Sequence, residues 1–223
     1  MKNTLIIGDT HIPFEHPKYL DFCKKIRDKY ECTNIYHIGD LVDNHAINFH
    51  THDPNGLGAA QEHREGLKRV RKWYRAFPKV RLCYGNHDEM VKRRALSHGI
   101  PDEFVADFRD IWEVPKGWDV QFQYQENNIK FMHGTGFSGL YPHVNAVRAN
   151  RQSCVIGHLH SVGGVHWSAS DHDLVFGLSV GCGVDKKAYA FNYGKDFQRK
   201  PILGCGVIKN QAQSVQFVGM RLD

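Results

Sequence analysis

The sequence predicts an α/β fold of four layers, in which two facing mixed β-sheets are flanked by helices. In the first 84 residues, apolar β-branched runs alternate with amphipathic helix patterns, which is typical of parallel strands joined by crossover helices. After about residue 110, short strand patterns separated by turn residues indicate a second sheet, expected to be mainly antiparallel. No linker, repeat or low-complexity tract interrupts the chain, so one domain covering residues 1–223 is expected.

The first half is expected to supply three buried strands and two helices. The apolar runs that predict strands are residues 5–7, 35–38 and 80–84. A first helix from about residue 16 to 30 has Leu20, Cys23, Ile26 and Tyr30 on one face. The apolar face of a second helix is formed by Leu67, Val70, Tyr74 and Phe77, and this helix ends before Pro78.

The second half is dominated by strand patterns. They cover residues 120–124, 129–132, 155–156, 163–167, 174–180, 202–208 and 215–218. A turn is expected at Asn127-Asn128, and a helix-like stretch starts near Pro142.

Composition excludes some classes of protein and leaves others open. The formal charge of +5, from 29 basic and 24 acidic residues, permits a polyanionic substrate without requiring nucleic acid. No apolar run approaches the roughly 20 residues that span a bilayer. The first strand pattern leaves no room for a signal peptide, so a cytoplasmic location is expected. The six cysteines include no Cys-x-x-Cys pair and are expected to be reduced and buried.

Five polar patches follow apolar runs and together predict a metal centre. They are Gly8-Asp9-Thr10-His11, Gly39-Asp40-Leu41-Val42-Asp43, Gly85-Asn86-His87-Asp88, Met132-His133-Gly134 and Gly157-His158-Leu159-His160. Because the tips of strands converge, side chains distant in sequence can surround one point. Carboxylate, amide and imidazole ligands without thiolate suit Mn, Fe, Zn, Co or Ni. The sequence does not select among these metals, and manganese is the one expected to serve in vitro.

The spacing within the patches suggests two ions. Asp9 and His11 are two residues apart beyond a strand, so both can face one metal. Asp40 follows the next strand, and its two carboxylate oxygens make it the candidate bridge between two cations. Two divalent ions near two aspartates retain positive charge, which favours a phosphate group, and they lower the pKa of bound water. Two-metal hydrolysis of a phosphoester, with hydroxide attacking phosphorus in line, is the predicted chemistry.

The five patches resemble the motifs of the calcineurin-like metallophosphoesterase superfamily, in the family's order, across residues 8–160. The resemblance is to the small stand-alone enzymes of phages and bacteria. It implies one metal held by Asp9, His11, Asp40 and His160. It implies a second metal held by Asp40, Asn86, His133 and His158.

The same resemblance assigns the proton-handling residues. His87 would contact phosphate and protonate the leaving oxygen, and Asp43 would orient His87 and raise its basicity. Asp88 is expected to support metal-binding histidines from behind. All these positions hold the family's residue types, so an active enzyme is expected.

A dinucleotide-binding oxidoreductase is the rival hypothesis, because residues 134–139 form a literal Gly-x-Gly-x-x-Gly after a strand pattern. Its context argues against it. The next strand pattern ends in His158 and His160 rather than in an acid that would bind ribose. A better explanation is that the glycines allow this loop to turn past His133 and to present backbone N–H groups to a phosphate.

The substrate is less defined than the reaction. Asn44 stands where protein Ser/Thr phosphatases of the superfamily have arginine, which disfavours a phosphoprotein. A nucleotide-like or small phosphoester is the leading hypothesis, and a nuclease or phosphodiesterase acting on DNA or RNA is the alternative. The oligomeric state is not readable. The element that reads the substrate is expected either in residues 44–60, a possible lid containing His50 and His52, or in the basic and aromatic stretch after Gly183.

Overall fold

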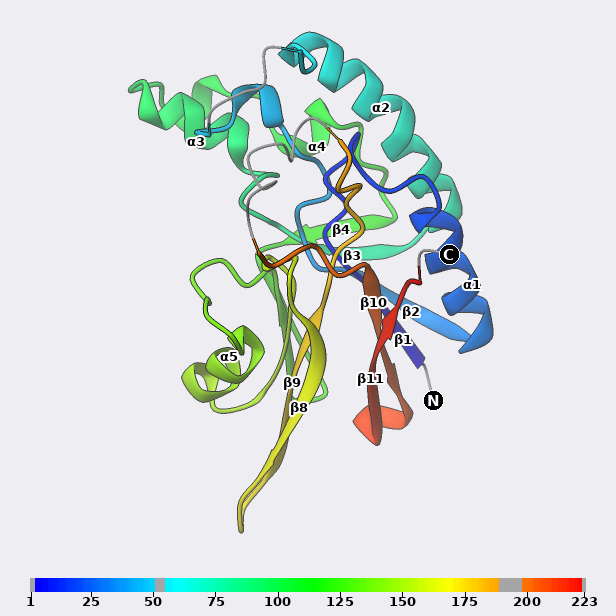
Figure 1. Ribbon diagram of the computed structural model, residues 1–223. Helices are drawn as coiled ribbons and strands as arrows, with labels where there is room; N and C mark the ends of the chain where they lie inside the picture. The colour runs from blue at the N-terminus through cyan, green and yellow to red at the C-terminus, as the bar shows by residue number, and fades with distance from the viewer. Residues whose placement is uncertain (1–2, 51–54, 189–197, 222–223) are drawn as a thin grey trace.

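Two mixed β-sheets lie face to face, with helices on their outer sides (Figure 1). The computed structural model describes residues 3–50, 55–188 and 198–221. The six-stranded sheet has the order β11-β10-β1-β2-β3-β4, and the five-stranded sheet has the order β5-β6-β7-β9-β8. The predicted fold class is therefore confirmed.

The first sheet is parallel in its middle and antiparallel at one side. Strands β1, β2, β3 and β4 are parallel neighbours, whereas β10 pairs with β1, and β11 with β10, in antiparallel fashion. The bounds are β1 Asn3–Ile7, β2 Cys32–His37, β3 Val80–Cys83, β4 Trp118–Gln121, β10 Gly204–Lys209 and β11 Ser214–Gly219. Helices α1 (Tyr19–Lys29) and α2 (Ala59–Ala76) follow β1 and β2 as the predicted crossovers.

The second sheet has two parallel and two antiparallel pairs. Strands β6, β7 and β9 are parallel, and β5 and β8 add antiparallel edges. The bounds are β5 Gln123–Glu126, β6 Ile129–Met132, β7 Ser153–Ile156, β8 Gly163–Ala169 and β9 Leu174–Val180. Helix α5 (Pro142–Asn150) joins β6 to β7, so this sheet also contains a crossover unit.

Successive side chains of β1 point to opposite faces of the sheet, and both faces are covered by apolar cores. Leu5 and Ile7 pack with α1 and α2 in one core, and Ile6 belongs to a second core between the sheets. There the rings of Tyr36 and Phe131, one from each sheet, stack with centroids 4.0 Å apart. A third cluster joins α5 to β7. A strand covered on both faces needs a continuous apolar run, which is the pattern that β1 shows in Leu5, Ile6 and Ile7.

Several expectations need correction. The predicted strand 120–124 is two strands, β4 and β5, which belong to different sheets and meet at the exposed Phe122. The late strands β10 and β11 join the first sheet, so the second sheet is mixed rather than mainly antiparallel. The first helix begins at Tyr19, later than expected. Helices α3 (Met90–Ser97) and α4 (Phe108–Ile111) were not anticipated, because their apolar faces are short.

Other expectations hold. All six cysteines are buried free thiols, as predicted. The expected turn at Asn127-Asn128 joins β5 to β6, and both residues have positive φ. In the described part of the chain, no helix is long and apolar enough to cross a membrane.

Candidate metal centre

The five polar patches converge at the carboxyl ends of strands from both sheets. Asp9 and His11 follow β1, Asp40 follows β2, and Asn86 follows β3. The second sheet contributes His133 after β6 and two histidines after β7. Among the described residues, three groups have ligand atoms within 4.8 Å of one another: Asp9, His11 and His160; His11, Asp40 and His87; Asp40, His133 and His158. The predicted ligands are thus brought together.

One cluster is formed by Asp9, His11 and His160. The Nε2 atoms of His160 and His11 are 2.9 Å apart, and His160 Nε2 lies 3.4 Å from Asp9 Oδ2. Asp9 Oδ2 also accepts a hydrogen bond from the backbone N–H of His158 at 2.8 Å. Asp9 is fully buried. These three side chains could hold one cation.

The other cluster adds an amide oxygen. His133 Nε2 lies 3.1 Å from Asn86 Oδ1 and 3.2 Å from His158 Nδ1. The hydroxyl of Thr135 also reaches Asn86 Oδ1, at 3.4 Å. Two imidazole nitrogens and an amide oxygen therefore face a common point.

Asp40 is the residue that both clusters share. Its Oδ2 atom lies 3.5 Å from His11 Nε2 and 3.1 Å from His133 Nε2. Its Oδ1 atom accepts a hydrogen bond from the backbone N–H of His87 at 2.8 Å, which fixes the carboxylate plane. One carboxylate oxygen thus lies between the two groups of histidines, as a bridging ligand would.

Hydrogen bonds on the far side of two imidazoles orient their Nε2 atoms. His11 Nδ1 lies 2.5 Å from Asp43 Oδ1, and His133 Nδ1 lies 3.1 Å from the carbonyl oxygen of Ile38. A proton on each Nδ1 satisfies these acceptors and leaves the Nε2 lone pair for a metal.

The cluster fits divalent cations by its donor set and by its charge. Asp9 Oδ1 is buried, and no hydrogen-bond partner is found for it among the described atoms. Burial lowers the pKa of His133, but the carboxylates of Asp40 and Asp9 outweigh burial and raise that pKa to about 9. The negative charge of the two carboxylates therefore favours a positive charge, such as that of a metal ion, in the site. Imidazole, carboxylate and amide donors without thiolate suit transition-metal ions.

Three candidate ligands have backbones in the left-handed region, where residues other than glycine are uncommon. The φ angles are 49° at His11, 48° at Asp40 and 67° at His158. Such conformations cost about 1–3 kcal/mol each and persist where the surroundings enforce them, often at functional sites. The sharp turns aim successive side chains from the strand ends into the centre.

The motif glycines leave room for the aspartates. A Cβ atom at Gly157 would lie 2.2 Å from Asp9 Oδ1 and 2.4 Å from Ile38 Cγ2. A Cβ atom at Gly85 would lie 2.2 Å from Asp40 Oδ1. The Gly-Asn and Gly-His pairs in the sequence therefore reflect close packing of one patch against another.

Replacing Gly157 by alanine is expected to displace Asp9 and weaken metal binding at least tenfold, with about 1–3 kcal/mol lost in stability through overpacking. Calorimetric titration with Mn²⁺ and thermal denaturation measure the two effects. Gly58→Ala is the matched control, because Gly58 has φ −72° and no atom within 4 Å of a built Cβ. Equal metal affinity in both variants would show that Asp9 does not need this clearance.

His87 lies beside the centre in contact with Asp43. Its Nδ1 atom is 2.6 Å from the Asp43 carbonyl oxygen and 3.2 Å from Asp43 Oδ1. Burial lowers the pKa of His87, but the charges of Asp40 and Asp43 outweigh burial and raise that pKa to about 10. With Nδ1 engaged, Nε2 is the atom left to meet a ligand.

Asp43 contacts three histidines: His11, His87 and also His45, whose Nδ1 atom lies 3.7 Å from Asp43 Oδ2. Its carboxylate is closest to His11, and it reaches His87 through both its backbone and its side chain. The expected contact with His87 is present, while the contact with His11 was not foreseen. Burial raises the pKa of Asp43, but hydrogen bonds from His11 and His87 outweigh burial and hold that pKa well below its usual value.

Asp88 forms its hydrogen bonds with the backbone. It accepts hydrogen bonds from the backbone N–H groups of Val42 at 3.2 Å and Gly85 at 3.0 Å. It therefore ties two polar patches together by their backbones, and its charge also helps to raise the pKa of His133. Burial, reinforced by the charge of Asp40, raises the pKa of Asp88 to about 8.

Two buried residues outside the patches also support the centre. His37 Nε2 lies 3.1 Å from the hydroxyl of Thr10, which itself donates to the Leu41 carbonyl oxygen. The carboxylate of Glu62 accepts the backbone N–H groups of His45 at 2.7 Å and Ala46 at 2.8 Å. The sequence offered no signal for either role, because each contact joins segments that are far apart along the chain.

The expected substrate-reading segments are only partly described. Residues 44–50 are held at the rim: Asn44 donates to the His87 carbonyl oxygen at 2.9 Å, and Arg94 donates to the carbonyl oxygens of Ile47 and Asn48. His52 and residues 189–197 lie outside the described residues, so the hypotheses that depend on them stay predictions.

Comparison with protein families gives a direct match. Residues 2–177 match the family model for the calcineurin-like phosphoesterases. No curated protein sequence matches the chain.

The solved structures that resemble this chain are distant from it in sequence. A metallophosphoesterase from Sphaerobacter thermophilus is 15% identical with a TM-score of 0.50, and the match covers 99% of this chain and 88% of that one. Vps29 from Chaetomium thermophilum is 13% identical with a TM-score of 0.48, over 100% and 88%. The phosphoesterase YfcE from E. coli is 13% identical with a TM-score of 0.44, over 93% and 88%.

Proposed function

The chain belongs to the calcineurin-like phosphoesterase family, and we propose that it hydrolyses a phosphoester at a centre of two divalent metal ions. Asp9, His11, Asp40 and His160 would hold one ion, and Asp40, Asn86, His133 and His158 the other. The position of Asp40 Oδ2, between His11 Nε2 and His133 Nε2, is the observation that supports this proposal. When bound, the ions would neutralise phosphate charge and lower the pKa of water.

The protein's own contribution is to position groups and to transfer a proton. His87 would donate its Nε2 proton to the leaving oxygen, since its Nδ1 is engaged by Asp43. Asp43 would keep the imidazole in this tautomer and stabilise its positive charge. The backbone N–H of His87 meanwhile anchors Asp40, so a single turn after β3 fixes both a metal ligand and the acid.

The rim supports a nucleotide-like or other small phosphoester as the substrate. Phe49 is half exposed and lies against the guanidinium groups of Arg93 and Arg94. Arg93 also donates to the carbonyl oxygen of Asn86 at 3.2 Å, so an aromatic ring and two cations lie near a candidate ligand. The aromatic ring could stack on a nucleotide base, and the guanidinium groups could bind a phosphate. Hydrolysis of DNA or RNA is the second candidate, favoured by the basic groove described below.

A substrate screen of the Mn²⁺-loaded protein tests the proposed function. We expect hydrolysis of p-nitrophenyl phosphate or its bis ester, and comparison with cyclic nucleotides and single-stranded oligonucleotides separates the two candidates. Chelation should abolish activity and excess Mn²⁺ should restore it, with Fe, Zn, Co and Ni compared in turn. Activity that survives chelation, or tight NAD binding by a protein without metal, would contradict the proposal.

A further inference from the structure

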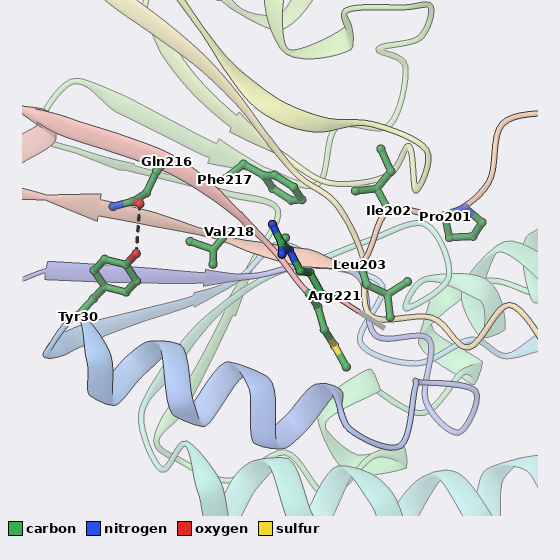
Figure 2. Close-up of a pocket in the computed structure, with 10 residues that line it drawn as sticks. Tyr30, Pro201, Ile202, Leu203, Gln216, Phe217, Val218 and Arg221 are labelled. Atoms are coloured by element: carbon green, nitrogen blue, oxygen red, sulfur yellow. Dashed lines mark hydrogen bonds between the residues drawn. The ribbon is translucent and has the colours of Figure 1, made fainter. Parts of the chain in front are cut away.

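A basic groove lies beside the metal centre, formed by two adjoining cavities. One cavity, of about 640 Å³, is bounded by Tyr30, by β11 and by the residues before β10 (Figure 2). The other, of about 490 Å³, lies between residues 16–18 and 184–187. Leu203 and Arg221 line both cavities, so the two adjoin at these residues, and we refer to them together as the groove.

The groove differs in character along its length. Its first part has aromatic and apolar walls, including Tyr30, Phe217 and Val218, with Tyr30 tied by its hydroxyl to Gln216 at 3.3 Å (Figure 2). The ammonium groups of Lys29 and Lys209 lie 5.3 and 5.7 Å from the centre of the Tyr30 ring. Apolar and aromatic surface is therefore accompanied by positive charge at this end.

The second part of the groove combines mainly apolar surface with several cationic side chains. Its lining includes Lys18, Lys186, Lys187 and Arg221. Within residues 3–50, 55–188 and 198–221, none of the ion pairs involves these four side chains. Asp185 is the single acid among the described lining residues, and its Oδ1 atom already accepts the backbone N–H of Lys187 at 3.0 Å. The groove thus presents positive charge with little internal neutralisation.

The groove is linked by backbone to the metal centre. Asp9 forms a β-bridge with Cys182, and Cys182 forms one with Leu203. Leu203 therefore lies about two strand spacings, roughly 10 Å, from Asp9. The next residue back, Ile202, donates its N–H to the carbonyl oxygen of His160 at 2.8 Å. A chain lying in the groove would be within a few phosphate spacings of the centre.

We propose that this groove binds single-stranded nucleic acid. Cations free of ion pairs can hold successive phosphates, and the apolar end can contact unpaired bases, which a duplex would keep in its interior. This inference rests on the second candidate for the proposed function, hydrolysis of DNA or RNA, because the groove would hold the nucleic acid that the metal centre cleaves. Binding itself does not require hydrolysis, so the two can fail separately.

Fluorescence anisotropy with a labelled 20-residue oligo(dT) tests the groove in full-length protein that carries His87→Ala to keep the oligonucleotide intact. Replacing Lys18, Lys186 and Lys187 by glutamine should weaken binding at least tenfold. It should also reduce the slope of log affinity against log salt by about 2, since each phosphate contact on a single strand contributes about 0.7. The same three changes in the wild-type background should alter p-nitrophenyl phosphate hydrolysis less than twofold.

The matched control removes equal charge elsewhere. Lys72, Arg75 and Lys79 are exposed residues on and just after α2, and their replacement by glutamine should change binding less than threefold. Equal losses in the two triple variants would overturn the proposal in favour of net charge alone. An abasic oligonucleotide should bind at least fivefold more weakly than oligo(dT). Equal affinity would overturn the assignment to nucleic acid and indicate a general polyanion site.

Discussion

Replacing His87 by alanine is expected to slow hydrolysis of an alkyl phosphate about 10²–10⁴-fold, the usual contribution of a positioned proton donor. The loss should be much smaller for p-nitrophenyl phosphate, because p-nitrophenolate is a stable leaving group without protonation. The ratio of kcat/KM for the two substrates measures this difference. The physical basis is the pairing of His87 Nδ1 with Asp43, which leaves Nε2 as the nitrogen that can donate a proton to a substrate.

Two controls separate proton donation from other roles of His87. His172→Ala removes an exposed imidazole in the β8–β9 turn and should leave both rates unchanged. His87→Ala should retain the metal content of the unaltered protein, because the proposed ligand set does not include it. An equal loss for both leaving groups would contradict the assignment and indicate that His87 only binds phosphate.

Replacing Asp40 by asparagine is expected to have the other large effect. The change removes a buried charge from the point between both clusters, and a loss of about 4 kcal/mol in transition-state stabilisation corresponds to about a 10³-fold fall in kcat/KM. Metal analysis of the purified protein should show the content falling from about two ions per chain to one or fewer. Activity should fall on every substrate, in contrast to the selective effect at His87.

The matched control for Asp40→Asn is Asp171→Asn, which changes an exposed carboxylate in the same way. Far-UV circular dichroism of both variants checks that the fold is kept, since asparagine can still accept the His87 backbone N–H. An Asp40→Asn protein with two ions and normal activity would exclude the bridging role.

The candidate centre could be predicted from sequence because its ligands are local to strand ends. Asp9 and His11, or His158 and His160, are two residues apart, so one strand tip delivers both. The shared position of Asp40 followed from its place after β2. The sequence pattern did not show the contacts around the ligands. Asp43 contacts His11 and His45 as well as His87, and Asp88 accepts hydrogen bonds from the backbone N–H groups of Val42 and Gly85.

The fold was predictable where an element has a local pattern of apolar residues that marks its buried face. It was less predictable where the chain passes from one sheet to the other or where strands distant in sequence pair. The run 120–124 has one continuous strand pattern, yet it crosses from one sheet to the other at Phe122. The antiparallel addition of β10 beside β1 joins residues about 200 positions apart. Local periodicity does not encode which strands pair. The basic groove could not be predicted for the same reason, because it is formed by segments around Lys18, Lys186 and Arg221 that are far apart in sequence.

The late arrival of β10 has a consequence for synthesis of the protein on the ribosome. All seven candidate ligands precede residue 161, but β1, which leads directly to Asp9, gains its second neighbour only at Gly204–Lys209. Until then the emerging chain has β1 as an open edge, with backbone groups that can pair with another molecule. The order of translation therefore leaves the strand that leads to the metal centre exposed to misassembly until β10 emerges and pairs with it.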